Sequence, residues 1–214
     1  MIKGVLFDMD GVLVDSENFM SQAAIIMFSE FGIKALPEDF NPFTGMGENK
    51  YLGGVAAKHG IVIDIEDAKA RAYEIYGEIV RGKLFPLPGA LSFINKCRDK
   101  GLRLALATSA DRVKMEVNLR ETGISPDLFQ AIVTGLDVEK KKPAPDIYLK
   151  AARTLGLSPD NCLVVEDAVS GIKAGKAAGC RVLAVRSSVE QIKLQEADWN
   201  CESLLKVPEE AMNW

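Results

Sequence analysis

The stretch FDMDG at residues 7–11 decides the fold class, because it ends an apolar run with two carboxylates. The preceding run, IKGVLF at residues 2–7, is apolar and partly β-branched, as buried strands are. Asp8 and Asp10 follow it directly, with Gly11 behind them. Two neighbouring carboxylates repel each other and resist burial, so this arrangement requires a positive partner.

The rest of the chain alternates between short apolar runs and helical patterns. Further buried strands are predicted at 102–107, 130–134, 162–165 and 181–185. Helices that end at lysine or glycine, or carry small residues, are predicted at 90–101, 113–123, 145–156 and 170–179. Strands that alternate with helices pair in parallel. The sequence therefore predicts an α/β fold with a doubly wound, Rossmann-like parallel sheet.

Residues 16–84 break this alternation and carry no strand pattern. The helical stretches there are 16–32 and 65–83, with a loop rich in proline and glycine at 37–47. We expect a small α-helical cap domain at 16–84, inserted after the first strand, and a core domain made of 1–15 and 85–214. Because α/β sheets bind ligands at the carboxyl ends of their strands, an insertion there would act as a lid.

Composition gives no indication of a nucleic-acid or membrane protein, and it does not exclude a phosphorylated small molecule as ligand. The 214 residues have a net charge of −4, which gives no basic face for nucleic acid. No apolar run approaches the about 20 residues needed to cross a bilayer, and acidic residues interrupt the stretch where a signal peptide would lie. We expect a cytoplasmic protein that is a monomer or a weak homo-oligomer.

Cysteine and histidine usage argues against a zinc site. The chain has one histidine and four cysteines, Cys97, Cys162, Cys180 and Cys201, without any CxxC spacing. We expect the cysteines to be small, reduced core residues.

Polar residues follow several of the predicted strands. They are Asp8 and Asp10, Thr108 and Ser109, Lys142, and Glu166 with Asp167. Because the carboxyl ends of parallel strands share one edge of a sheet, we expect these side chains to converge. Carboxylates at that density need a cation, and hard oxygen ligands favour Mg²⁺. Lysine and hydroxyl groups complement phosphate oxygens.

This set of residues predicts phosphoryl transfer through an aspartyl-phosphate, with Asp8 as the nucleophile. Like unit charges 4 Å apart repel by about 4 kcal/mol at an effective dielectric of about 20, so a carboxylate that attacks a phosphate needs positive neighbours. Mg²⁺ and Lys142 would supply them. Asp10 would protonate the leaving oxygen and later activate water.

The motifs resemble those of the haloacid dehalogenase superfamily over nearly the whole chain. The matching positions are Asp8-Met9-Asp10-Gly11-Val12, then Thr108, then Lys142, and last Glu166-Asp167. The resemblance implies that the Asp8 carboxylate, the Asp10 backbone carbonyl and Asp167 hold Mg²⁺. It also implies that Glu166 lies at the metal site, as a ligand or behind the ligands. Thr108, Ser109 and Lys142 would then bind the phosphoryl group.

The helical insertion is similar to the cap of the β-phosphoglucomutase and phosphoglycolate phosphatase group. The stretch 39–56 is also similar to the hydrolase domain of a plant chloroplast photoprotection protein. β-Phosphoglucomutases carry a histidine and an arginine in the cap, where this chain has Met20 and Glu48. Methionine does not move protons and glutamate repels phosphate, so hydrolysis is favoured over isomerisation. Lys50 would partly replace the arginine as a substrate-binding residue.

We therefore predict a Mg²⁺-dependent phosphatase that acts on a small phosphorylated metabolite, with a sugar phosphate as the expected substrate. The first alternative is a sugar-phosphate mutase related to β-phosphoglucomutase. A dehalogenase is disfavoured, because that chemistry has no leaving alkoxide for Asp10 to protonate. The alternative from another class is a binding or regulatory module with vestigial activity, against which the intact set of acidic and basic residues argues.

Overall fold

A computed structural model of the chain describes residues 1–43, 47–186 and 196–213. Its centre is one parallel sheet with the strand order β3-β2-β1-β4-β5-β6. The strands are β1 (Gly4–Phe7), β2 (Arg103–Ala107), β3 (Ala131–Val133), β4 (Cys162–Glu166), β5 (Arg181–Val185) and β6 (Trp199–Cys201). The five predicted strands and the doubly wound parallel sheet are confirmed. The three-residue edge strand β6 was not predicted, because so short a segment carries no periodic pattern.

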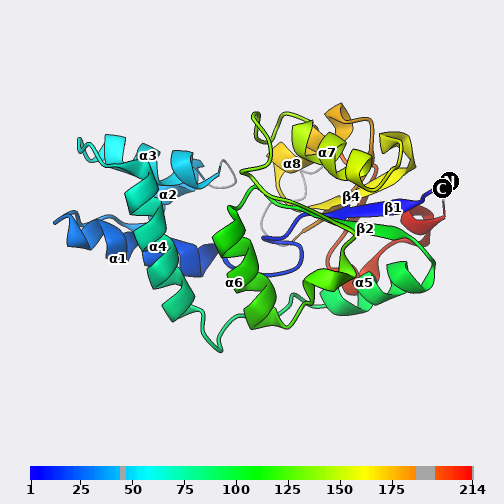
Figure 1. Cartoon of the computed structure of the whole chain (residues 1–214), viewed down its shortest axis with the longest axis horizontal. Helices are drawn as coiled ribbons and strands as arrows, with labels where there is room; N and C mark the ends of the chain where they lie inside the picture. Colours follow the sequence, from blue (N-terminus) through cyan, green and yellow to red (C-terminus); the bar gives the residue numbers. More distant parts are fainter. Residues whose placement is uncertain (44–46, 187–195, 214) are drawn as a thin grey trace.

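Helices cover both faces of the sheet (Figure 1). They are α5 (Ala90–Asp99), α6 (Arg112–Thr122), α7 (Asp146–Thr154) and α8 (Val169–Ala177). Successive side chains of β1 point to opposite faces of the sheet, as they do in any strand. Phe7 packs edge-on against Phe93 of α5, with ring centroids 6.0 Å apart, whereas Leu6 belongs to the apolar cluster that includes Tyr148 of α7. Strand β1 is therefore buried from both sides, and its carboxyl end is fixed in the middle of the sheet edge.

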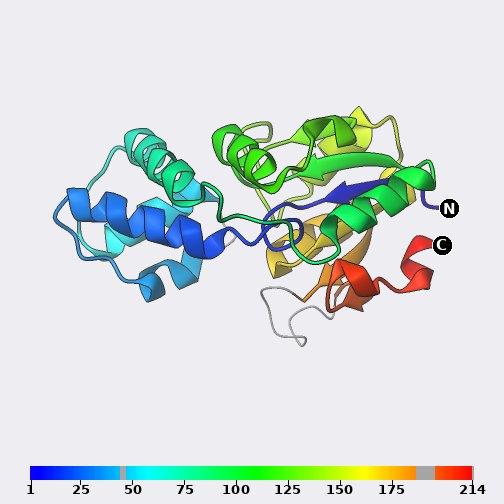
Figure 2. The same cartoon turned by 90° about the horizontal axis from the view of Figure 1, so that it is seen from below.

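Four helices between β1 and α5 form a separate group at one end of the molecule (Figures 1 and 2). They are α1 (Glu17–Glu30), α2 (Pro37–Phe40), α3 (Glu48–Lys58) and α4 (Ile65–Ile79), with the 3₁₀ turn η1 (Asn41–Phe43). The predicted loop 37–47 contains α2 and η1, and its residues 44–46 lie outside the described residues. We refer to this helical group as the cap. The boundaries of the cap and core domains stay a prediction.

Helix α3 was not predicted, because Gly53 and Gly54 lower helix propensity in its centre. The ring of Phe43 lies where a side chain at residue 54 would be, so Gly54 is needed for η1 to pack on α3. Tertiary packing thus overrides local propensity. Further 3₁₀ turns lie in the core, namely η2 (Pro126–Leu128), η3 (Pro159–Asn161), η5 (Leu204–Lys206) and η6 (Glu209–Met212).

All four cysteines are buried and unpaired with one another, as predicted. Burial raises their thiol pKa values, that of Cys97 to about 12, so these thiols stay protonated. Within the described ranges, none of the helices is both long and apolar enough to cross a membrane.

Candidate active site

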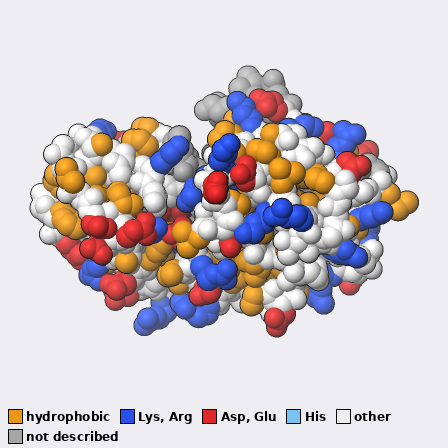
Figure 3. All heavy atoms as spheres, turned by 45° about the horizontal axis from the view of Figure 1, so that its top comes forward, with side chains coloured by type: hydrophobic (Ala, Val, Ile, Leu, Met, Phe, Trp, Pro, Cys, Tyr) orange, Lys and Arg blue, Asp and Glu red, His pale blue; other side chains and the backbone are white. Residues whose placement is uncertain are grey.

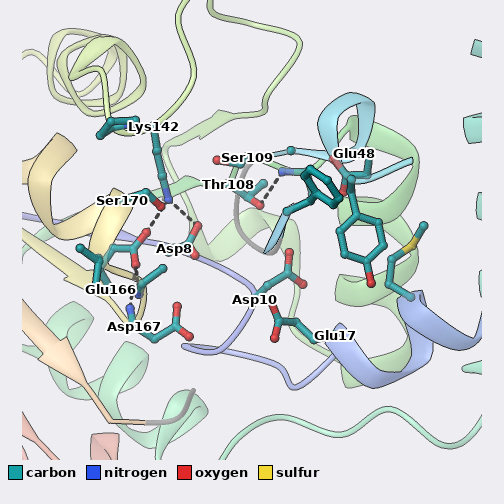
Figure 4. A pocket seen from close by; sticks show the side chains of 18 of the residues that line it. Asp8, Asp10, Glu17, Glu48, Thr108, Ser109, Lys142, Glu166, Asp167 and Ser170 are labelled. Carbon is teal, nitrogen blue, oxygen red and sulfur yellow. Dashed lines mark hydrogen bonds and ion pairs between the residues drawn. The ribbon is translucent and has the colours of Figure 1, made fainter. Parts of the chain in front are cut away.

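Asp8, Lys142 and Glu166 form a buried chain of charges at the carboxyl edge of the sheet (Figure 4). Asp8 follows β1 directly and Glu166 ends the neighbouring strand β4. The Lys142 Nζ donates to Asp8 Oδ1 at 2.8 Å and to Glu166 Oε1 at 2.7 Å. Residues distant in the sequence meet here because parallel strands end at one edge, which is the convergence that the sequence predicts.

Burial sets the protonation behaviour of this chain of charges. Burial raises the pKa of Asp8 to about 7, with Lys142 acting to lower it and Glu166 acting to raise it. Burial alone would lower the pKa of Lys142, but Asp8 and Glu166 outweigh it and raise that pKa well above its usual value. Lys142 therefore stays an ammonium group, while Asp8 has more negative charge around it than one lysine balances.

Glu166 has hydrogen-bond donors on both carboxylate oxygens. Besides Lys142, Oε1 accepts from the Tyr148 hydroxyl at 3.2 Å. Oε2 accepts from the backbone N–H groups of Asp167 and Ala168, each at 2.7 Å. The sequence leaves open whether Glu166 is a direct metal ligand. Because donors already occupy both of its oxygens, the structure favours a role in positioning Lys142 instead.

Gly171, in the first turn of α8, leaves the space that the Glu166 carboxylate occupies. A Cβ atom at residue 171 would overlap Glu166 Oε1, which cannot retreat without breaking its hydrogen bonds. We expect Gly171→Ala to lower the free energy of unfolding by about 1–3 kcal/mol. Chemical denaturation would measure this. The matched change Gly77→Ala, in α4 with open space around it, should instead stabilise by about 0.5–1 kcal/mol. Stabilisation by both changes would contradict this account of Glu166.

Carboxylate oxygens of Asp8, Glu166 and Asp167 lie within 4.8 Å of one another, and all three residues are buried. Lys142 contacts Asp8 and Glu166 of this cluster, and one ammonium group does not balance those two carboxylates, so a divalent cation would lower the repulsion between them. Gly11 has φ +77°, and a Cβ there would overlap the Asp167 carboxylate. The residues present therefore fit a hard divalent cation such as Mg²⁺.

Asp10 lies on the cap side of the same site (Figure 4). Its carboxylate accepts hydrogen bonds from three side chains. Lys114 Nζ donates to Oδ2 at 2.9 Å, and Oδ1 accepts from Asn118 Nδ2 at 3.2 Å and from the Ser16 hydroxyl. Lys114 was not identified from the sequence, although it shares a helix face with Asn118 at i, i+4 in α6. Asp10 is thus paired with Lys114, whereas Asp8 and Glu166 are paired with Lys142.

Thr108 and Ser109 follow β2 and complete the sheet edge. Thr108 is buried and its hydroxyl accepts from the Ala110 N–H at 3.1 Å. Asp111, not Thr108, is the N-cap residue of α6, which leaves Thr108 without a capping role. Both residues face the cavity between the sheet and the cap.

The cavity has a volume of about 510 Å³, within the range of about 300–1,000 Å³ usual for small-molecule sites. Its lining includes Asp8, Asp10, Glu17, Met20, Glu48, Thr108, Ser109, Lys114, Lys142, Glu166 and Asp167. Lys50 is exposed and does not line it, so the structure does not bring that predicted residue into the site. The cap instead contributes Glu48, which is buried and lies 4.0 Å from Lys114.

Comparisons with known proteins match most of the chain. A family model described as haloacid dehalogenase-like hydrolase matches residues 2–179. Protein SUPPRESSOR OF QUENCHING 1, chloroplastic, of Arabidopsis thaliana is 43% identical over 92% of the chain, which spans only 19% of that protein's length. Hexitol phosphatase A of Escherichia coli is 32% identical over 96% of the chain and 93% of that protein. The structure of CbbY from Rhodobacter sphaeroides in complex with phosphate superposes with a TM-score of 0.90, at 26% identity, over the full length of both chains.

Proposed function

Because the chain belongs to the haloacid dehalogenase-like hydrolase family, we propose that it is a Mg²⁺-dependent phosphatase of a small phosphorylated metabolite, of the sugar or polyol phosphate class. The observation that carries the proposal is the buried Asp8 carboxylate, held at 2.8 Å by Lys142 beside two further carboxylates. The relative named hexitol phosphatase A and the CbbY structure with phosphate support the same chemistry.

In the proposed reaction, an Asp8 oxygen attacks phosphorus and the bond to the substrate oxygen breaks. Asp10 donates its proton to that leaving oxygen, which departs as an alcohol. Asp10 then takes a proton from water, which attacks phosphorus, releases phosphate and regenerates Asp8. Thr108, Ser109 and Lys142 would hold the phosphoryl oxygens during both steps.

Asp8, Asp167 and the Asp10 carbonyl would hold Mg²⁺, as the family resemblance implies, with Glu166 behind them. When bound, the cation would supply positive charge that offsets the repulsion between Asp8 and the phosphoryl group. Asp8 needs this help, because Lys142 divides its charge between Asp8 and Glu166.

The cap would exclude water during transfer and contact the rest of the substrate. Two contacts between cap and core hold it over the cavity: Lys69 pairs with Asp111 at 2.8 Å, and the Tyr76 hydroxyl donates to Asn118 at 2.5 Å. Because Lys50 lies outside the cavity, we assign it no role in this arrangement. Location in the cytoplasm and a monomeric or weakly oligomeric state are proposals that rest on the sequence alone.

The cap residues favour hydrolysis over a mutase reaction. Met20 and Glu48 line the cavity at the positions where mutases of the resembled group carry a histidine and an arginine. Methionine cannot shuttle a proton to a hydroxyl, and the glutamate carboxylate would repel a second phosphate. A regulatory module without activity is disfavoured by the intact contacts among Asp8, Lys142 and Glu166.

A panel of phosphate monoesters tests the proposal. We expect inorganic phosphate to be released from sugar and polyol phosphates with Mg²⁺ and not after its removal by chelation. Isomerisation of β-glucose 1-phosphate, primed by a bisphosphate, without phosphate release from any compound would instead establish the mutase. Absence of both reactions would leave the binding module as the better account.

Mg²⁺ is expected to raise the melting temperature more at pH 8 than at pH 6. The folded protein holds the pKa of Asp8 at about 7, so at pH 6 the carboxyl must lose a proton before it binds a cation. Asp8 in the unfolded chain ionises near pH 4, so the stabilising effect of its raised pKa is lost as pH rises through 7. A cation at 100 times its dissociation constant would add about 2.7 kcal/mol, or about 5–10 °C.

Thermal denaturation with MgCl₂, against NaCl of equal ionic strength, measures this shift. The Asp167→Asn variant serves as the control, since it lacks one proposed ligand and should show a smaller shift at pH 8. An equal shift at both pH values, or one that Asp167→Asn keeps in full, would place the cation elsewhere.

A further inference from the structure

The cap half of the cavity differs in charge from the half around Asp8. Its side chains come from α1, η1 and α3: Glu17, Met20, Phe43, Glu48 and Tyr51. Within the described residues, the cap contributes two carboxylates to the lining and no lysine or arginine. The lysines that line the cavity all come from the core, and each contacts a carboxylate: Lys114 with Asp10, Lys142 with Asp8, and Lys173 with Glu196.

Glu48 is the cap residue whose position points to a ligand (Figure 4). It is only 7% exposed, and none of the described residues offers its Oε2 a hydrogen-bond partner. Among the described residues, Lys114 is the cation within 4.0 Å of Glu48, on the side of Oε1, but that lysine donates to Asp10 at 2.9 Å. A buried oxygen without a donor is unfavourable, and a hydroxyl of a bound molecule would satisfy it.

The local charges disfavour a second anionic group on the substrate. Asp10, Glu17 and Glu48 place three carboxylates around one ammonium group, that of Lys114. Charge repulsion is stronger beside buried side chains such as Glu48 and Lys114 than at an open surface, because the effective dielectric is lower. A second phosphate or a carboxylate would therefore bind weakly there, whereas uncharged hydroxyl groups would find acceptors.

We propose that Glu48 determines substrate specificity: its Oε2 accepts a hydrogen bond from the alcohol part of the substrate and its charge excludes a second anionic group. The substrate class that this selects is a monophosphate ester of an uncharged polyhydroxy alcohol. The inference rests on the proposed phosphatase function and adds to it the class of leaving group. On the outer surface that Figure 3 shows, acidic and basic side chains are intermixed.

Matched substrate pairs test the inference. Glucitol 6-phosphate and 6-phosphogluconate differ at one end in a hydroxymethyl against a carboxylate group, as glycerol 3-phosphate and 3-phosphoglycerate do. We expect kcat/KM to be higher for the alcohol of each pair by about 10–100-fold, and Glu48→Gln to lower that ratio about tenfold. The ratio separates specificity from general damage to the fold, which would slow both substrates alike.

Glu78→Gln is the matched control, because Glu78 is exposed on α4 of the same cap and does not line the cavity. Its substrate ratio should equal that of the unchanged protein. An unchanged ratio in Glu48→Gln, or a preference of the unchanged protein for the carboxylate substrates, would overturn the inference.

Failure of the phosphatase proposal would be seen separately, as absence of phosphate release from every compound. Binding then decides the inference without turnover. Calorimetry on the Asp8→Asn protein should show glucitol 6-phosphate bound at least about tenfold more tightly than 6-phosphogluconate. The additional Glu48→Gln change should reduce that difference. Equal affinities in the Asp8→Asn protein would contradict a role of Glu48 in selection.

Discussion

The Asp8→Asn variant is expected to release phosphate at least about 10⁴-fold more slowly than the unchanged protein, because an amide cannot form the proposed aspartyl-phosphate. The loss should fall on kcat for every ester in the panel, whatever its leaving group. A colorimetric phosphate assay under single-turnover conditions measures it directly. Among the expected effects of single changes in this chain, this is the largest.

Retention of the fold is the control for this variant. Asparagine has nearly the shape of aspartate, and Lys142 should keep its contact with Glu166, which is 2.7 Å in the unchanged protein. We therefore expect circular dichroism and cooperative unfolding to be preserved. Activity within about tenfold of the unchanged protein, in a variant that folds normally, would assign the nucleophile to another residue.

Most of the core and its half of the site could be predicted from the sequence, because both depend on local patterns. Each of the strands β1 to β5 belongs to a short apolar run, and polar residues at strand ends must meet once the strands pair in parallel. Asp8, Thr108, Lys142 and Glu166 therefore come together in the structure as the sequence predicts.

Lys114 and Glu48 could not be placed in the same way. Whether Lys114 points inward depends on how α6 is rotated against the sheet, and the apolar pattern of that helix is weak. Glu48 and Lys50 lie two residues apart at the start of α3, one buried and one exposed. Which of them faces the cavity depends on helix α3. That helix cannot be predicted from propensity, because Gly53 and Gly54 lie in its centre.

The Asp10→Asn variant is expected to lose activity by about 10²–10⁴-fold on alkyl phosphates, since the leaving alkoxide needs a proton. On p-nitrophenyl phosphate the first step should be nearly intact, because p-nitrophenolate leaves without one. The second step still needs Asp10 to take a proton from water. Stopped-flow absorbance should therefore show a burst of about one p-nitrophenolate per chain, followed by slow turnover, as the aspartyl-phosphate accumulates.

The same variant tests whether Lys114 acts on Asp10 independently of Lys142, which contacts Asp8 and Glu166. The amide introduced by Asp10→Asn would keep a hydrogen bond to Asn118 but remove the carboxylate that Lys114 contacts directly. Lys114 would then have only the more distant charges of Glu17 and of Glu48, which lies 4.0 Å away. Because Lys142 does not contact Asp10, its contacts with Asp8 and Glu166 should persist, and the first step with them. An equal loss on both substrates without a burst would mean that Asp10 supports the attack by Asp8. Asp10 would then have no separate role as acid and base, and Lys114 and Lys142 would not act independently.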